Sequence, residues 1–100
     1  MLIYVDIDET IADYQPGEDK TAYENAAPIP MNIEKINKLY DEGNTIIYWT
    51  ARGSVSKIDY YPLTKSQLDS WGCKYHELIT GEKPPYDLII CDKSRRIEEI

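Results

Sequence analysis

The sequence predicts a single α/β domain in which helices pack on a mainly parallel β-sheet. Three short apolar runs, at 2–5, 45–49 and 87–91, show no polar alternation, which is typical of strands covered on both faces. Segments with helical periodicity separate these runs, and alternating strands and helices favour parallel pairing. With 100 residues and 42% hydrophobic content the chain can bury one modest core, so we expect one domain over 1–100.

The first strand, at 2–5, is followed by a helix within 30–44 that ends near Gly43. Apolar side chains at helical spacing define the buried face of this helix: Ile33, Ile36, Leu39 and Tyr40. The second strand, at 45–49, leads to a second helix at about 61–71, in which Pro62 suits the first turn. Its Leu68 and Trp71 would face the sheet, and Gly72 would close it.

A weaker strand at 74–79 and the run at 87–91 complete the sheet, and KSRRIEEI at the end of the sequence suits a short helix. These elements fit a Rossmann-like three-layer sandwich of about four strands in the order 3-2-1-4, joined by right-handed crossovers. Ligands bind such sheets beyond the carboxyl ends of the strands. Three polar stretches follow strands at that edge, DIDET, TARGS and CDKS, so we place the candidate site there.

Charge and cysteine content narrow the class of protein. Eighteen acidic residues against 11 basic ones argue against nucleic-acid binding, whose affinity is largely electrostatic. Cys73 and Cys91 lack metal-type spacing and a disulfide framework, which favours a reducing compartment. The first apolar run has no positively charged segment before it, and no run reaches membrane-spanning length. We therefore expect a cytoplasmic protein without membrane contact.

Asp6 and Asp8 end the first predicted strand, in LIYVDIDET. Two carboxylates at a strand end repel each other unless a cation or a proton intervenes, and such hard oxygen ligands suit Mg²⁺. Asp92, at the end of another strand, offers a third carboxylate. The alternative is that Asp6 and Asp8 only cap the following turn, although Asp6 interrupts an apolar run where an unpartnered carboxylate is costly.

Four motifs in chain order resemble those of the haloacid dehalogenase superfamily of aspartate-nucleophile phosphohydrolases. VDIDET resembles the first motif, and IIYWT, ending in Thr50, resembles the second. Lys83 in GEKPPYD stands where the third motif places its lysine, and LIICDKS resembles the acidic fourth motif. The resemblance covers nearly the whole chain and is strongest to small members without a cap domain, such as capsular-polysaccharide phosphatases.

The resemblance implies a magnesium-dependent phosphatase. Asp6 would attack phosphorus and form an aspartyl-phosphate, while Asp8 would protonate the leaving oxygen and then activate the hydrolytic water. Mg²⁺ would be held by Asp6, the backbone carbonyl of Asp8 and Asp92. The Thr50 hydroxyl and the Lys83 ammonium would donate to the equatorial phosphate oxygens.

Several assignments have alternatives. Arg52, in TARGS, would bind phosphate or another substrate anion from the mouth of the site, or else form an exposed structural ion pair. Lys83 could be an ordinary solvated lysine with Lys65 as its rival, and Thr50 could be only a β-branched strand residue. His76, the one histidine, is expected to be structural.

The sequence departs from the family pattern at two positions. Cys91 stands where close relatives carry the first of two adjacent acids, and a thiol is a poor magnesium ligand. The metal site keeps its charge if Asp92 reaches the ion and Cys91 is a buried strand residue. Glu9 replaces the glycine common in the first motif and is expected to be a solvated turn residue.

Segment 12–28 occupies the place where capped relatives insert a lid domain, and at this length it predicts only a flap. An open site implies a bulky substrate or a cover supplied by a second subunit of a homo-oligomer. Four tyrosines in or beside segments near the mouth would either stack on a sugar or base or pack in the core: Tyr14, Tyr23, Tyr60 and Tyr61.

Three functions follow. The leading hypothesis is a magnesium-dependent phosphatase acting on a small phosphorylated metabolite such as a sugar phosphate. The second keeps this chemistry but takes a nucleic-acid 3′-phosphate, which the net charge of −7 disfavours. The third is a catalytically weak phosphate-binding regulatory protein, with Cys91 as the sign of lost activity.

Overall fold

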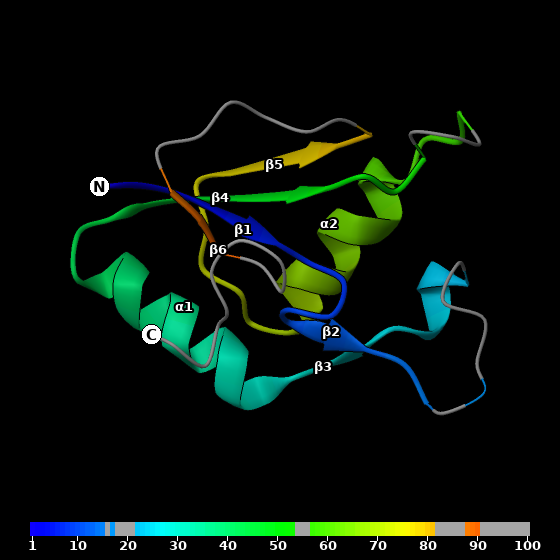
Figure 1. Ribbon diagram of the computed structural model, residues 1–100, viewed down its shortest axis with the longest axis horizontal. Helices are drawn as coiled ribbons and strands as arrows, with labels where there is room; N and C mark the ends of the chain where they lie inside the picture. Colours follow the sequence, from blue (N-terminus) through cyan, green and yellow to red (C-terminus); the bar gives the residue numbers. More distant parts are fainter. Residues whose placement is uncertain (16, 18–21, 54–56, 82–87, 91–100) are drawn as a thin grey trace.

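The computed structural model describes residues 1–15, 17, 22–53, 57–81 and 88–90. Its main sheet is built from β1 (Leu2–Asp6), β4 (Thr45–Thr50) and β5 (Glu77–Thr80), which pair in parallel with β4 between the other two (Figure 1). On its other side β1 pairs in parallel with β6 (Leu88–Ile90). The parallel pairing of β1, β4 and β5 confirms the predicted α/β class.

The strand registers bring the carboxyl ends of the strands to one edge. Asp6, the last residue of β1, is the register partner of Trp49, and Thr50 at the end of β4 is the partner of Thr80 at the end of β5. The chain therefore leaves β1 and β4 at neighbouring points, so that the residues after Asp6 lie near those after Thr50.

Helices α1 (Pro30–Asp41) and α2 (Tyr61–Ser70) begin and end close to their predicted limits. Each has a proline in its first turn, where the missing N–H has no intrahelical partner to lose. Gly43 and Gly72 follow the helices with φ of 97° and 75°, conformations that favour glycine. The core lies between the helices and one face of the sheet and is formed mainly by Ile3, Val5, Ile33, Ile36, Ile46, Tyr48, Leu68 and Leu78.

Both helices of the described residues cover the same face of the sheet (Figure 1), so the third layer of the predicted sandwich is not among the described elements. The crossovers from β1 to β4 and from β4 to β5 move across the sheet in the same direction. Because right-handed crossovers of one direction put their helices on one side, α1 and α2 share a layer. The other face carries a smaller cluster, Leu2, Tyr4, Ile47, Trp49 and Ile79. The predicted terminal helix lies outside the described residues.

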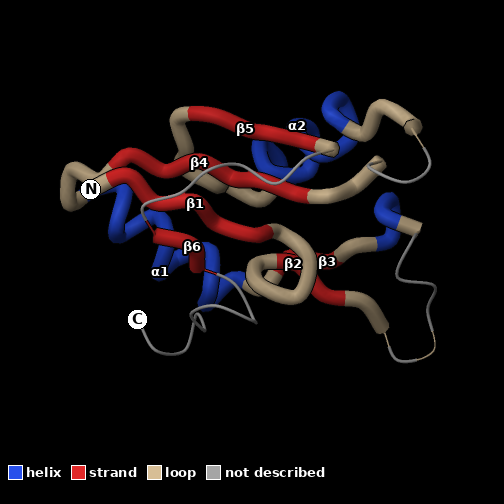
Figure 2. The backbone as a smooth tube through the Cα atoms, turned by 45° about the horizontal axis from the view of Figure 1, so that its top comes forward, coloured by secondary structure: helices blue, strands red, loops and turns tan. Residues whose placement is uncertain are grey.

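The described part of segment 12–28 has its two ends joined. β2 (Ala12–Asp13) pairs antiparallel with β3 (Ala27–Pro28), and the short 3-10 helix η1 (Tyr23–Asn25) precedes β3 (Figure 2). The N–H of Ile29 also donates to the carbonyl oxygen of Ile11 at 2.8 Å. The segment therefore leaves and rejoins the domain at neighbouring points.

His76 fixes the start of β5 against β4. Its N–H donates to the carbonyl oxygen of Ile46 at 2.8 Å, and its Nδ1 accepts from the N–H of Ile46 at 3.1 Å. The imidazole also stacks on Tyr40, with 4.7 Å between ring centroids. These contacts agree with the structural role expected for this histidine. Within the described ranges, no helix has the length and apolar character needed to cross a membrane.

Candidate functional site

The chain turns sharply after β1, around a single carbonyl group. The carbonyl oxygen of Ile7 accepts hydrogen bonds from the N–H groups of Thr10, Ile11 and Ala12, at 3.2, 2.9 and 3.2 Å. Ile7 and Ile11 are fully buried, so both the hydrogen bonds and the core hold this turn. The turn fixes the backbone of Asp8, which lies one residue beyond Ile7.

Glu9 adopts a backbone conformation that is unusual for a residue with a side chain. Its φ is 67°, in the left-handed region that favours glycine because a Cβ crowds the following carbonyl there. Its N–H donates to the carbonyl oxygen of Ala12 at 2.7 Å, which keeps the conformation in place. A glycine would adopt this conformation without strain, whereas Glu9 adopts it with a strained backbone.

Asp6 and Thr50 lie at the same edge of the sheet. Asp6 is half-buried, and its Oδ1 accepts from the N–H of Ile7 at 2.8 Å, which orients the carboxylate. Thr50 is 2% exposed, and its Oγ1 accepts from the N–H of Arg52 at 3.2 Å. Because the Thr50 oxygen accepts this bond, its own O–H is the group left to donate to a ligand. The Thr50 hydroxyl therefore holds the backbone of Arg52, a role that the preference of threonine for strands does not explain.

Arg52 and Asp8 form a bidentate ion pair in the site. Arg52 donates from Nη2 to Oδ1 of Asp8 at 2.7 Å and from Nε to Oδ2 at 3.0 Å. Tyr14 donates from its hydroxyl to Oδ1 at 3.0 Å. The Arg52 side chain is 0% exposed and that of Asp8 is 25% exposed, so the pair reaches solvent only through the carboxylate.

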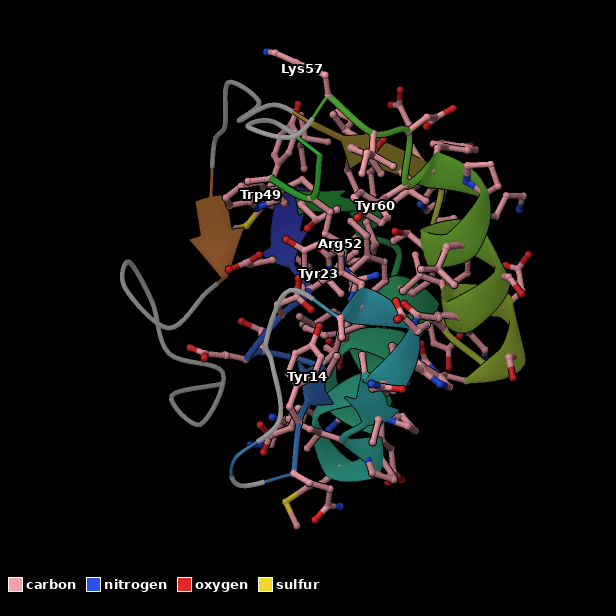
Figure 3. All side chains as sticks on the ribbon, turned by 90° about the vertical axis from the view of Figure 1, so that its right-hand side faces the viewer. Tyr14, Tyr23, Trp49, Arg52, Lys57 and Tyr60 are labelled. Carbon is pink, nitrogen blue, oxygen red and sulfur yellow. The ribbon has the colours of Figure 1, made fainter. Side chains whose placement is uncertain are left out.

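Other contacts hold the far side of the Arg52 guanidinium. Its Nη1 donates to Oγ1 of Thr64 at 3.2 Å and to Oε1 of Gln67 at 2.7 Å, both on α2. The ring of Tyr23 lies 4.7 Å from the guanidinium carbon and packs edge-on against Tyr60. Gln67 in turn donates from Nε2 to the carbonyl oxygen of Tyr23 at 2.7 Å. Figure 3 shows Arg52 between the tyrosines of this edge.

These contacts also shift the pKa values of Arg52 and Tyr14. Burial lowers the pKa of Arg52, but the hydrogen bonds and charge of Asp8 outweigh it, so the pKa of the guanidinium lies above its ordinary value. Burial, followed by the charge of Asp8 and the hydrogen bond to it, raises the pKa of the Tyr14 hydroxyl. Arg52 is therefore a fixed cation, and Tyr14 remains a neutral donor.

The structure gives Arg52 a place that differs from the predicted one. The sequence suggested a group that binds a substrate anion at the mouth of the site or forms an exposed ion pair. The guanidinium is instead buried and committed to Asp8, Thr64 and Gln67. The short stretch TARGS could not reveal this, because the partners of Arg52 come from three other segments.

Tyr14, Tyr23 and Lys65 also have defined positions. Tyr14 and Tyr23 contact the Asp8–Arg52 pair directly, a role that the sequence did not indicate. Lys65, the rival of Lys83, is exposed on α2 and pairs with Asp69 at 3.1 Å. Lys83, Cys91 and Asp92 lie outside the described residues, and so does the predicted sharing of a metal ion between Asp6 and Asp92.

Sequence reasoning missed Thr64 and Gln67. They lie three residues apart on α2 and so share one helix face, which is the spacing that two side chains need to hold one guanidinium. That spacing recurs by chance in most helices. A signal therefore existed, but it could not be recognised without knowing that Arg52 is buried beside it.

Two groups at the turn have the chemistry of ligands for a hard divalent cation. The Asp6 carboxylate and the backbone carbonyl of Asp8 are oxygen ligands of the kind that Mg²⁺ prefers, with its remaining positions left to water or phosphate. The Asp8 carboxylate is bound by Arg52, so only its backbone oxygen suits this role. In the described ranges, which do not include Asp92, no three His, Cys, Asp or Glu side chains are grouped to hold a metal.

Comparison with known proteins defines the fold. No family model matches the chain, and no curated protein matches it. A crystal structure of a target protein from Vibrio cholerae matches with a TM-score of 0.73 and 25% sequence identity, over 98% of this chain and 85% of that one. Its description states no function, so what this similarity establishes is the compact α/β fold.

Proposed function

We propose that the chain is a magnesium-dependent phosphatase of the haloacid dehalogenase type, with the sheet order 3-2-1-4 of such domains. It would hydrolyse a phosphate monoester, such as a sugar phosphate, through an aspartyl-phosphate intermediate. One observation carries the proposal: Asp6 ends β1, Asp8 follows in a fixed turn, and the Thr50 hydroxyl ends the adjacent strand. Groups with the chemistry of a nucleophile, an acid–base catalyst and a hydrogen-bond donor to phosphate thus lie at one edge of the sheet.

In the first step, an oxygen of the Asp6 carboxylate bonds to phosphorus while the bond from phosphorus to the leaving oxygen breaks. Asp8 gives its proton to that oxygen, so the leaving group departs as an alcohol while the phosphoryl group stays on Asp6. In the second step Asp8 takes a proton from water, the water oxygen bonds to phosphorus, and the bond to Asp6 breaks. Both carboxylates then return to their starting state and inorganic phosphate is released.

The remaining groups would stabilise negative charge on the phosphate and on the nucleophile. Thr50 and Lys83 would donate to the equatorial phosphate oxygens, where the charge of the transition state is spread. Asp6, the Asp8 carbonyl and Asp92 would hold Mg²⁺, which supplies the positive charge that lets an anionic nucleophile approach a phosphate.

A second candidate is a phosphate-binding protein with weak catalysis. The observation that favours it is the hold of Arg52 and Tyr14 on Asp8, whose oxygens accept three hydrogen bonds. A carboxylate that accepts three hydrogen bonds from the protein has few positions left to contact a substrate.

The proposal is tested by the hydrolysis of p-nitrophenyl phosphate with Mg²⁺ and with excess chelator. The Asp6→Asn variant should lose at least about 1,000-fold in kcat, because the amide is a far poorer nucleophile. Asp41→Asn is the matched control, since Asp41 pairs with Lys74 on the exposed side of α1 and should change kcat less than about twofold.

Wild-type turnover by Asp6→Asn would reject the assignment of the nucleophile. Binding of inorganic phosphate without turnover by the wild-type protein would favour the second candidate. Faster hydrolysis of an oligonucleotide 3′-phosphate than of sugar phosphates would replace the small-metabolite substrate with a polymer end.

A further inference from the structure

The two oxygens of the Asp8 carboxylate have different surroundings. Oδ1 accepts two hydrogen bonds, from Nη2 of Arg52 and from the Tyr14 hydroxyl, whereas Oδ2 accepts one, from Nε of Arg52. Each carboxylate oxygen offers about two lone-pair sites. With respect to the donors that the structure describes, Oδ1 is therefore saturated, and Oδ2 keeps one site for a proton.

Arg52 imposes this difference because the guanidinium itself is held. Nη1 is bound by Thr64 and Gln67 from α2, and Tyr23 covers the guanidinium at 4.7 Å. A planar fork fixed at its far end aligns both carboxylate oxygens at once, and a lysine ammonium cannot do so. The side chain is 0% exposed, so it acts on Asp8 and does not reach a substrate in solvent.

We propose that Arg52 is a positioning residue that fixes the orientation of the Asp8 carboxylate and leaves Oδ2 as the oxygen that a substrate can reach. The inference rests on the proposed function, because it takes Asp8 as the acid–base group. It adds to that function a buried arginine from the loop after β4, with Thr64 and Gln67 of α2 as its supports.

A positioning residue of this kind has a kinetic signature. A misaligned acid slows the departure of a poor leaving group more than that of a good one, because the good one needs little help from a proton. Phenyl phosphate and p-nitrophenyl phosphate make a matched pair, since they share the ring and the phosphate but differ in the quality of the leaving group. Because hydrolysis of the aspartyl-phosphate is common to both substrates, the ratio of their kcat/KM values, which covers the steps up to departure of the leaving group, reports on proton transfer from Asp8 to that group.

The test compares Arg52→Lys with the wild-type protein. The kcat/KM for phenyl phosphate should fall about 10–100-fold, the kcat/KM for p-nitrophenyl phosphate should fall several-fold less, and KM should stay within about twofold for both. Thr64→Val removes one support and leaves the Arg52–Asp8 pair, so it should change the same ratio in the same direction by about two- to fivefold. Lys65→Met, on the exposed face of the same helix, is the control and should leave the ratio unchanged.

Equal losses for the two substrates would overturn the proposal, because they indicate general damage to the site. A rise in KM without a change in the ratio would overturn it as well and assign Arg52 to substrate binding. If Arg52→Lys does not fold, Thr64→Val decides by the same ratio. An inactive Asp6→Asn with an unchanged ratio in the Arg52 and Thr64 variants sinks this inference alone, whereas an active Asp6→Asn sinks the proposed function too.

Discussion

Replacing Glu9 by glycine should stabilise the protein, because its φ of 67° lies where a Cβ is crowded. A non-glycine residue in this region costs roughly 1–2 kcal/mol. Glycine removes that cost but adds roughly 0.4–1 kcal/mol of chain entropy to the unfolded state. The difference favours glycine by about 0.5–1 kcal/mol.

The comparison that isolates the backbone is Glu9→Gly against Glu9→Ala. Both variants lose the contacts of the glutamate side chain, but only alanine keeps the Cβ. For a chain of this length, the expected difference in the free energy of unfolding corresponds to a Tm higher by roughly 2–8 °C for glycine.

The assay is thermal and urea unfolding followed by circular dichroism. Lys38, exposed in α1, provides the opposite control: Lys38→Gly should be less stable than Lys38→Ala by about 1 kcal/mol, since helical backbone favours alanine. A Glu9→Ala variant as stable as Glu9→Gly would refute the reasoning and would mean that the turn does not impose the left-handed conformation.

Three further predictions concern buried groups. Burial raises the pKa of Cys73 to about 12 from 9.0, so in the Cys91→Ser variant the Cys73 thiol should react with a thiol reagent at pH 8 roughly 1,000-fold more slowly in the folded protein than in urea. Equal rates would contradict this prediction. The stability that depends on the neutral thiol is present below about pH 9 and is lost as the pH rises toward 12. The pKa of Tyr14 is likewise raised, so the contribution of its hydroxyl to stability is present below about pH 10 and is lost as the pH rises further. In urea unfolding, Tyr14→Phe should therefore lower the free energy of unfolding by about 1 kcal/mol at pH 7.5 and by less at pH 10.5. A difference that stays constant between these two pH values would count against this prediction. Leu68→Ala removes a fully buried side chain from α2 and should cost about 2–5 kcal/mol by the same assay, with a smaller loss indicating that the helix repacks.

The elements that sequence patterns predicted best are those whose signal is local. The stripe that includes Ile33 and Ile36 fixed α1 and its buried face, and the apolar runs before Asp6 and Thr50 located the two central strands. The shared face of the two helices was also within reach, because a strand order of 3-2-1 with right-handed crossovers requires it.

The surroundings of Arg52 could not be predicted in the same way. A charged residue between an alanine and a glycine after a strand reads as solvated, and burial becomes favourable only when a carboxylate and several acceptors surround it. Asp8 lies 44 residues before it in the chain, and Gln67 lies 15 residues after it. No local pattern records such distant partners.

Segment 12–28 is fastened close to both of its ends, by Tyr14 on the carboxylate of Asp8 and by Tyr23 under Arg52. Lengthening a loop between two fixed points adds only about 0.6 kcal/mol for each doubling of its length. A whole module could therefore be spliced in between these two anchors while the host domain keeps its shape. Such an attachment point offers evolution, or a protein engineer, a simple route to adding a module to this domain.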